Sequence, residues 1–512
     1  MPSLFAVEQN GAREHARDRV VTRAAAALRS GLNIGALQKW IVAAAMVVAA
    51  LIGWAQLQHR SIWYDEAITL LTTSGHAKLD WALGMAQFKP SANLAKIATE
   101  LYEQDVHPPL YFWALAIWRV AFGESLEVAR CLSLVLVVAT LALLYRAAVD
   151  WGMKWAAVPA VVYALSAAGL RYAYDARPYA MAAFLIVLTL CLVNRGSKWA
   201  GACAAASIAT HYFAALCVGP ILLLGIAQHW KTKRKWAWLT TVTFAGCLAP
   251  LLPLLRIHVR ARPVQYAGFV NFREELWALL KGAMESVMPS TWLPHWGYAL
   301  LLGAVFAGIG GWWAYRQKKS PIVLVYLGFL IGFLALAMAT NKSILQMPAD
   351  YYAGIAAPLL ALLIGFGVEA EPRGSLALAL VFLAGTATHT SMTKSVDYRS
   401  MTADMRSQCS DCPVLVGVGY VGAIPACVLY EAKGMKVWLL KPGDTVDSAW
   451  RRMGEPERFF LVPSNEPATI GIEHEMERAL AARQGNGYIE LDTNPQLQAG
   501  EYAAPREKQA NN

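Results

Sequence analysis

Long apolar runs occupy most of the chain between residues 39 and 392, and they constrain the fold more than any other feature of the sequence. A helix needs roughly 17–25 predominantly apolar residues to cross the hydrocarbon core of a bilayer. Hydrophobic residues make up 57% of the chain and charged residues only 16%, which is too apolar for several soluble domains. The sequence therefore predicts a polytopic α-helical membrane protein. The candidate spans lie at 39–57, 126–147, 154–170, 179–194, 199–228, 236–254, 297–315, 321–339, 351–368 and 374–392.

The run at 199–228 is longer than one span requires and carries His211-Tyr212 near its middle. Polar side chains are costly inside hydrocarbon, so the run divides more naturally into two short helices that meet at this pair. With that division we expect about eleven transmembrane helices.

Residues 108–122 decide the topology. They are apolar but short, rich in aromatic side chains and interrupted by Arg119, which favours a helix lying in the membrane interface over one that spans. Basic residues then fall on the cytoplasmic side throughout, as the positive-inside rule requires. They lie in the N-terminal arm (1–38), at Lys154, and at 195–198, 231–235 and 316–319. This clustering accounts for the net charge of +10 without a nucleic-acid partner.

An adjacent acid pair, Asp65-Glu66, lies just beyond the first apolar run and is preceded by Trp63 and Tyr64. Charges beside a bilayer are expensive to hold near apolar surroundings, so the pair indicates chemistry, with a solvated loop edge as the alternative. The interfacial topology places further polar groups on the same outer face. They are His107, Glu124, Arg130, Asp175, Arg177, His211 and the loops at 256–296 and 340–350.

Residues 393–494 differ from the rest of the chain because short strands alternate with helices, which predicts a small α/β domain on the outer face. The last residues, 495–512, are predicted to be disordered. We expect strands at Val414–Val418, Lys436–Leu440, Phe459–Val462 and Tyr488–Leu491, and helices at 422–433, 445–453 and 470–484.

Cys409 and Cys412 form a CxxC pair in this domain, and a disulfide between them would fit an oxidising compartment. A zinc site is less favoured, because no second CxxC or His pair completes four ligands. Residues 417–422 match the dinucleotide fingerprint formally. The residue at the end of the next strand is Lys441 rather than an acid, which removes the ribose contact and argues against a nicotinamide cofactor.

Four motifs follow one another along the first half of the chain. They are the acid pair Asp65-Glu66, then His107-Pro108-Pro109-Leu110 with aromatics, then Gly123-Glu124 followed by Ala129-Arg130, and then Asp175-Ala176-Arg177-Pro178-Tyr179. In this order they resemble the polyprenyl-phosphate-sugar-dependent glycosyltransferases of the GT-C class. That class includes the protein O-mannosyltransferases and the aminoarabinose transferases of lipid A. The resemblance covers roughly residues 40–230.

The resemblance implies a bacterial inner-membrane glycosyltransferase with a GT-C-like domain over 39–392, whose active site and α/β domain face the periplasm. Such an enzyme would move a sugar from a polyprenyl-phosphate carrier to a lipid, glycan or protein acceptor, with inversion. By the same resemblance, Asp65 would be the catalytic base and Glu66 its partner. Asp175 would be a second acid, at a position where most relatives carry Glu.

This transfer needs a carboxylate within hydrogen-bond reach of the acceptor hydroxyl, and cations near the departing phosphate. The residues expected to bind substrate are Tyr64, His107, Arg177, His211, Arg260, Arg262 and Lys342, with Arg256 as a further cation. Many relatives carry an Arg-Tyr pair just before the helix that begins here at Tyr351-Tyr352, where this chain reads Met347-Pro348-Ala349-Asp350. Lys342 or the 256–262 group would then have to replace that Arg.

Some of these residues have structural alternatives. Arg177 is adjacent to Asp175 and could be its salt-bridge partner instead of a phosphate ligand. His107 could simply begin a helix, since Pro108-Pro109 suits a first turn. His211 could be a core histidine bonded to the backbone.

No cofactor is required by this interpretation, although Asp65, Glu66 and Asp175 could coordinate Mg²⁺ or Mn²⁺ together with a lipid phosphate. The first outer loop contains no Asp-x-Asp, so we expect metal independence. Two rival functions stay open. A transporter or lipid-linked-sugar flippase would place acids near the bilayer midplane and show internal repeats. A non-catalytic membrane subunit would recruit partners through 393–494.

Overall fold

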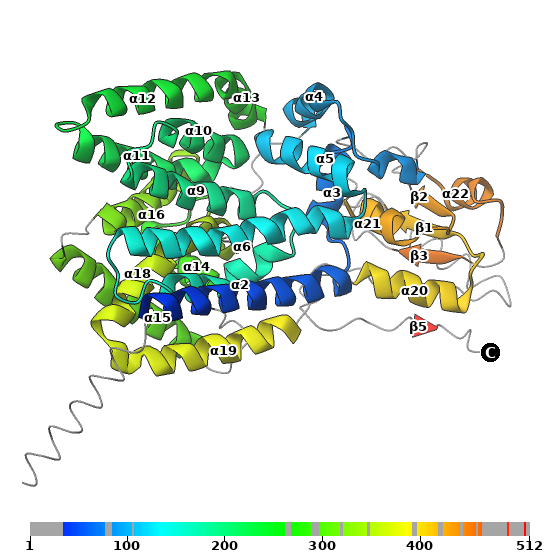
Figure 1. The fold of residues 1–512 in the computed structure, drawn as a ribbon. Coiled ribbons are helices and arrows are strands. Elements are labelled where there is room, and N and C mark those ends of the chain that lie inside the picture. Colours follow the sequence, from blue (N-terminus) through cyan, green and yellow to red (C-terminus); the bar gives the residue numbers. More distant parts are fainter. Residues whose placement is uncertain are drawn as a thin grey trace, which may run out of the picture.

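The structure is a computed structural model in which long helices run side by side and a small sheet lies beyond one end of them (Figure 1). Of the basic arm predicted at 1–38, residues 1–33 lie outside the described residues and residues 34–38 are helical. The residues that the structure describes are 34–76, 84–104, 107–261, 268–288, 296–317, 321–345, 349–391, 397–417, 423–440, 444–456, 459–462, 489–490 and 506–507.

Among the described residues, 7 helical segments are long and apolar enough to cross a membrane, which confirms the predicted polytopic membrane protein. They are α2 (Ile34–His59), α6 (Leu126–Asp150), η2 with α11 (Tyr212–Ala214, Ala215–His229), α12 with η3 and α13 (Arg234–Leu248, Ala249–Leu251, Leu252–Ala261), α15 (Trp296–Arg316), α16 (Pro321–Ala339), and α17 with η4 and α18 (Ala349–Ala353, Gly354–Ala356, Ala357–Ala370). Shorter apolar helices accompany them: α5 (Leu110–Phe122), α9 (Tyr179–Asn194), α10 (Ala200–Thr210), and η5 with α19 (Pro372–Gly374, Ser375–Ser391). Which of these shorter helices also span remains a prediction.

Two apolar runs are broken in the structure. The 199–228 run divides as expected, because α10 ends at Thr210 and His211 caps the turn η2 by accepting a hydrogen bond from Phe213 N. The run at 154–170 was expected to span as one helix, and this is wrong. It divides into α7 (Val158–Ala164) and α8 (Ala167–Ala173). Ser166 is the cause, since its Oγ accepts from Gly169 N and donates to Tyr163 O, as a helix-starting serine does.

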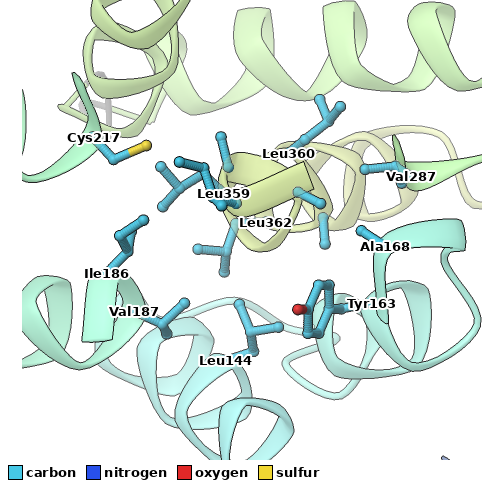
Figure 2. Packing of buried hydrophobic residues seen from close by; sticks show 14 of the residues in the cluster. Leu144, Tyr163, Ala168, Ile186, Val187, Cys217, Val287, Leu359, Leu360 and Leu362 are labelled. Atoms are coloured by element: carbon cyan, nitrogen blue, oxygen red, sulfur yellow. The ribbon is translucent and has the colours of Figure 1, made fainter. Parts of the chain in front are cut away.

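Helix α18 is the centre of the membrane domain. Residues 357–368 are all buried, which suits a helix that is apolar on every side and surrounded by other helices. Leu359, Leu360 and Leu362 pack among side chains of α6, α7, α9 and α14, including Leu144 and Tyr163 (Figure 2). The large apolar core of the molecule is therefore built around this helix.

The backbones of α15 and α18 approach closely at two glycines. A Cβ on Gly310 would meet Leu363 O, and a Cβ on Gly367 would meet Phe306 O. Small residues at helix contacts in membranes allow this kind of approach. The α15–α18 contact therefore depends on the absence of side chains at these positions.

One end of the helical bundle carries the loops that are rich in Lys and Arg. Gln38 Nε2 donates to Lys154 O, and Lys154 N donates to Glu369. Arg195 pairs with Asp150 at the same end, where the first turn of α12 also lies (Figure 1). The structure therefore gathers the basic loops at the end opposite the sheet.

The other end carries the short helices α3 (Tyr64–Thr72), η1 (Gly84–Phe88) and α4 (Leu94–Gln104), whereas α14 (Phe272–Val287) packs against α17 and α18 within the bundle (Figure 1). Arg119 of α5, which the sequence analysis took as an interruption of an apolar helix, is 1% exposed. Its guanidinium donates to Leu70 O at 3.1 Å, Phe88 O at 2.6 Å and Glu124 O at 3.0 Å. Arg119 thus joins α3 and η1 to α5; the interfacial placement of α5 stays a prediction.

The C-terminal region is a small α/β domain, as predicted. Its strands are β1 (Val414–Gly417), β2 (Val437–Leu440), β3 (Phe460–Val462), β4 (Ile489–Glu490) and β5 (Arg506–Glu507). They form a sheet of the order β2-β1-β3-β4-β5, in which every pair is parallel except β4 with β5. The tail was predicted to be disordered, but within it Arg506–Glu507 forms β5 against β4. The predicted helix at 470–484 and the glycines at 419 and 422 lie outside the described residues. The described helices of this domain are α20 (Tyr398–Gln408), α21 (Ala423–Glu431) and α22 (Val446–Arg452).

Cys409 and Cys412 form a disulfide between the end of α20 and the start of β1. This is the pairing that the CxxC spacing allowed. The remaining cysteines are free thiols, and most of them are buried among apolar side chains.

Candidate active site

The acid pair begins helix α3. Trp63 is its N-cap, and Trp63 N donates to Glu66 Oε2 at 3.4 Å. Carboxylates in a first helical turn are favoured by the unpaired backbone N–H groups and the helix dipole. The local sequence therefore accounts for a helix that starts at this point with two acids in its first turn. The surroundings of the two acids differ sharply.

Glu66 is fully buried, and both of its oxygens are engaged. Arg130 donates from Nε to Oε1 at 2.8 Å and from Nη2 to Oε2. Ala176 N also donates to Oε1, at 3.0 Å. Glu66 thus links its own turn to α6 and to the loop that carries Asp175. This geometry is that of a positioning residue.

Arg130 also holds the end of α2. It donates to Leu57 O at 3.2 Å, Arg60 O at 2.8 Å and Ser61 O at 2.9 Å. The last carbonyls of a helix have no partner within the helix, and a cation there is favoured. The carboxylate that pairs with Arg130 is Glu66.

Asp65 is the accessible member of the pair, with 29% of its side chain exposed. Arg177 Nη2 lies 3.5 Å from Asp65 Oδ2, and Arg177 Nη1 donates to Thr69 Oγ1 and to Asp65 O. Arg177 Nη2 also lies 3.3 Å from His107 Nε2. The salt-bridge alternative for Arg177 is thus realised with Asp65 rather than with its neighbour Asp175. Three of the four sequence motifs meet at this guanidinium.

Asp175 is 4% exposed and faces the same turn. Trp63 Nε1 donates to its Oδ1 at 3.0 Å, whereas its Oδ2 has no hydrogen-bond partner among the described residues. Burial, together with the negative charge of Glu66, raises the pKa of the Asp175 carboxyl well above its usual range. The raised pKa shifts the Asp175 carboxyl toward its protonated form, and Oδ2 is the oxygen left available to carry that proton.

His211 closes the site from the α10–α11 break and is 5% exposed. Its ring centroid lies 6.0 Å from that of His107 and 5.2 Å from that of Tyr179. Its Nδ1 accepts from Phe213 N, so the backbone bond of the structural alternative is present. His211 nevertheless lies in the same cluster as His107.

An aromatic wall lies beside these groups. The ring centroids of Tyr179 and Tyr351 are 4.5 Å apart, and those of Trp63 and Tyr351 are 6.0 Å apart. Tyr352 continues the wall toward Phe213, at 5.3 Å. Tyr64 stands edge-on to Trp63 at 4.9 Å and is 46% exposed. Aromatic faces of this kind suit contact with a sugar ring or an isoprenoid chain.

Arg171 is a site residue that the sequence analysis missed. It pairs with Asp350 at 2.9 Å and lies 4.9 Å from the centroid of the Tyr351 ring. Arg171 therefore places a guanidinium beside Tyr351, although the residue that precedes Tyr351 in the chain is Asp350 and not an arginine. The signal was present, because Arg171 precedes the Asp175 motif in the same segment.

The remaining predicted cations are not joined to this cluster. Lys342 is half-buried in a loop fixed by Glu275, whose carboxylate accepts from Ser343 Oγ and Ile344 N. No contact in the described part of the chain links Lys342 to Asp65 or Asp175. Arg256 is exposed. The side chain of Arg260 and the whole of Arg262 lie outside the described residues.

The three acids that could coordinate a metal ion, Asp65, Glu66 and Asp175, differ in their contacts. No group of three His, Cys, Asp or Glu side chains within the described ranges is placed to hold a metal ion. Glu66 is already committed to Arg130. The expected metal independence is not tested by this observation and stays a prediction.

Comparison with solved structures supports the fold. No family model and no curated protein sequence matches this chain. The crystal structure of ArnT from Cupriavidus metallidurans in the apo state is similar over 89% of this chain and 93% of that chain, with a TM-score of 0.51 and 12% identity. The ArnT structure bound to undecaprenyl phosphate matches with a TM-score of 0.46 and 13% identity, over 91% and 96% of the two chains. The chain has a GT-C-like fold, as its motifs predicted.

Proposed function

We propose that this chain is a membrane glycosyltransferase that moves a sugar from a polyprenyl-phosphate carrier to an acceptor on the periplasmic side, with inversion. The observation that carries the proposal is the meeting of separate motifs around one accessible carboxylate. Asp65, His107 and Arg177 come from three different segments, and both the Asp65 carboxylate and the His107 ring lie within contact distance of the Arg177 guanidinium. The GT-C-like fold supports the same conclusion.

Asp65 is the catalytic base in this proposal. Its carboxylate accepts the proton of the acceptor hydroxyl while that oxygen bonds to the anomeric carbon of the donor sugar. The bond between that carbon and the phosphate oxygen breaks in the same displacement, and the lipid phosphate leaves. A single displacement inverts the configuration at the anomeric carbon.

The Arg177 guanidinium and the two imidazoles beside it serve the departing phosphate, Arg177 as a cation and His211 as a hydrogen-bond donor. Arg177 is held by Thr69 and Asp65 with His107 beside it, and His211 completes the group. Fixed cations and hydrogen-bond donors at the point where charge develops stabilise the transition state. A phosphate accepts charge readily, so no general acid is needed on the leaving side.

Asp175 contributes a neutral carboxyl group. Its Oδ1 already accepts from Trp63, and the proton on Oδ2 is placed to donate to a bound sugar or phosphate oxygen. Glu66 keeps a positioning role in this proposal, because its oxygens are occupied by Arg130 and Ala176. The sequence analysis expected Glu66 to act catalytically as the partner of the base Asp65, and here we propose that it supports Asp65 through position alone.

The location of the acids favours an enzyme over a transporter. Asp65 and Glu66 lie in the first turn of a short helix beyond the end of α2, and Asp175 lies in the loop between α8 and α9. Acids that carry a transported proton or ion would be expected nearer the middle of the spans. The acceptor class, whether lipid, glycan or protein, is open to a mass-spectrometric comparison of envelope glycans with and without this protein.

The test is sugar transfer by the purified Asp65→Asn variant with a polyprenyl-phosphate sugar as donor. We expect the rate to fall by about 10²- to 10⁴-fold, which is the usual contribution of a general base. Asp150→Asn is the matched control, because Asp150 is the last residue of α6 and lies at the basic end of the bundle, away from Asp65. Normal transfer by Asp65→Asn would remove Asp65 from the mechanism.

A further inference from the structure

The α/β domain contacts the acid turn through Glu431, the last residue of α21. Glu431 Oε1 accepts from Ile62 N at 3.1 Å and from Ser61 Oγ at 3.4 Å. The Glu431 side chain is 8% exposed, so these bonds are largely shielded from water. Ile62 directly precedes Trp63, the residue that caps α3 and bonds Asp175.

Arg399 of α20 reinforces this contact. Its Nε lies 3.4 Å from Glu431 Oε2, and its backbone N donates to Ser61 Oγ at 3.2 Å. The guanidinium also reaches Gln58 O and Glu127 Oε1. The α/β domain thus bonds the end of α2, the turn after it and the start of α6.

The same region is joined by a shared apolar core. Ile62 and Leu70 belong to one buried cluster with Val416 of β1 and Val428 of α21. Tyr430 OH also accepts from Leu126 N at 2.9 Å. The α/β domain therefore shares its apolar core with helix α3 and the turn before it.

The turn at 60–63 is held from two sides. Arg130, from the membrane domain, binds the carbonyls of Leu57, Arg60 and Ser61. The amide of Ile62 is bound from the α/β domain by Glu431. Losing one of these anchors would leave the position of the first turn of α3 less fixed, and with it the direction of the Asp65 carboxylate.

We propose that Glu431 is a positioning residue for Asp65, which makes the α/β domain a working part of the active site. Glu431 touches no reacting group; it acts through the Ile62 amide on the Trp63–Asp65 turn. The kinetic part of this inference rests on the proposed transferase function. The structural part concerns the mobility of one turn and can be measured without any activity.

The experiment compares Glu431→Ala with Glu431→Gln in the full-length protein. The glutamine keeps an oxygen that can accept from Ile62 N, whereas the alanine removes it. Asp411→Asn is the control, because Asp411 is an exposed acid of the same domain. For Glu431→Ala we expect kcat to fall by about 10- to 100-fold, as for a small misplacement of a catalytic group, with an unchanged KM for the lipid donor. Glu431→Gln should stay within about threefold of the unmodified protein.

Hydrogen–deuterium exchange of the peptide covering residues 57–70 supplies the second readout. Exchange there should rise in Glu431→Ala and stay near normal in Glu431→Gln and Asp411→Asn. An unchanged kcat in Glu431→Ala, an equal loss in Glu431→Gln, or increased exchange spread over the whole α/β domain would each overturn the proposal. If the unmodified protein transfers no sugar, the proposed function fails, and the exchange of 57–70 still decides whether Glu431 holds the turn.

Discussion

Arg130 and Glu66 form the buried ion pair on which the acid turn depends. Both side chains are at most 2% exposed, and the pair is bidentate. Breaking a buried pair leaves the other charge without compensation, which usually costs several kcal/mol. Here the loss of the pair would also displace the turn that carries Asp65 and the loop that carries Asp175.

Replacing Arg130 by Ala should therefore lower the free energy of unfolding by about 3–5 kcal/mol. Arg146→Ala is the matched control on the same helix, since Arg146 is 52% exposed in its pair with Asp150, and it should cost about 0–1 kcal/mol. Thermal unfolding in detergent, followed by circular dichroism, measures both. Equal stability of the two variants would show that the Glu66 pair does not hold the turn.

Trp63 gives a prediction about pH. Its hydrogen bond to Asp175 Oδ1 lowers the pKa of Asp175, against the burial and the Glu66 charge that raise it. Trp63→Phe removes the donor and keeps most of the ring, so the pKa of Asp175 should rise further. If protonated Asp175 is the active form, activity is lost as pH rises through that pKa. The alkaline limb of the kcat profile should then move to higher pH.

A shift of the alkaline limb to lower pH in Trp63→Phe, or no shift, would contradict a protonated Asp175. Trp118→Phe is a suitable control, because the Trp118 indole donates to Val128 O and not to a carboxylate.

Short motifs identified some site residues and not others. Asp65, His107, Asp175 and Arg177 stand in recognisable local patterns, and the structure brings them together. Glu431 gave no such signal. Its partner Ile62 is 369 positions away in the chain, and a pairing over that distance leaves no local pattern. Arg119 was read as a break in an apolar helix, because its backbone carbonyl partners cannot be read from residue types.

At the scale of single elements, apolar length predicted the long helices well. It failed at 154–170, where Ser166 and Gly169 form a helix start inside an apolar run. The strands of the α/β domain were placed within one or two residues of β1, β2 and β3. Helix contacts were not predictable, because a close approach depends on which glycines of two helices face each other.

The α15–α18 contact is the clearest case. Gly310→Ala should destabilise the protein, because the added methyl would meet the backbone of α18 at Leu363 O. Gly308→Ala on the same helix is the control, since its Cβ would meet nothing within 4 Å. The apparent Tm in detergent should drop for Gly310→Ala and stay or rise for Gly308→Ala, because alanine favours helix over glycine. The reverse order would mean that the two helices do not meet at these glycines.

For the whole molecule, the structure separates two ends. The basic loops meet at one end, and the acid motifs with the α/β domain meet at the other. The positive-inside rule then predicts that the acid end faces the periplasm. The sequence indicated this separation because Lys and Arg cluster between spans, but the sidedness itself remains a prediction.

Cysteine labelling tests the sidedness. Lys433→Cys in the α/β domain should react with a membrane-impermeant maleimide in intact spheroplasts, because Lys433 is exposed on the acid end. Lys231→Cys, exposed at the basic end, should react only after permeabilisation. The opposite pattern would place the Asp65 cluster in the cytoplasm and exclude a periplasmic acceptor.

The bond between Glu431 and the Ile62 amide also has a consequence for biosynthesis. Ile62 leaves the ribosome long before Glu431 is translated, because 369 positions separate them. If the bond acts as proposed, a nascent or prematurely terminated chain holds its acidic helix start only loosely. Such a chain would transfer sugar poorly, and full activity would arrive only after α21 has been translated and has packed against the turn.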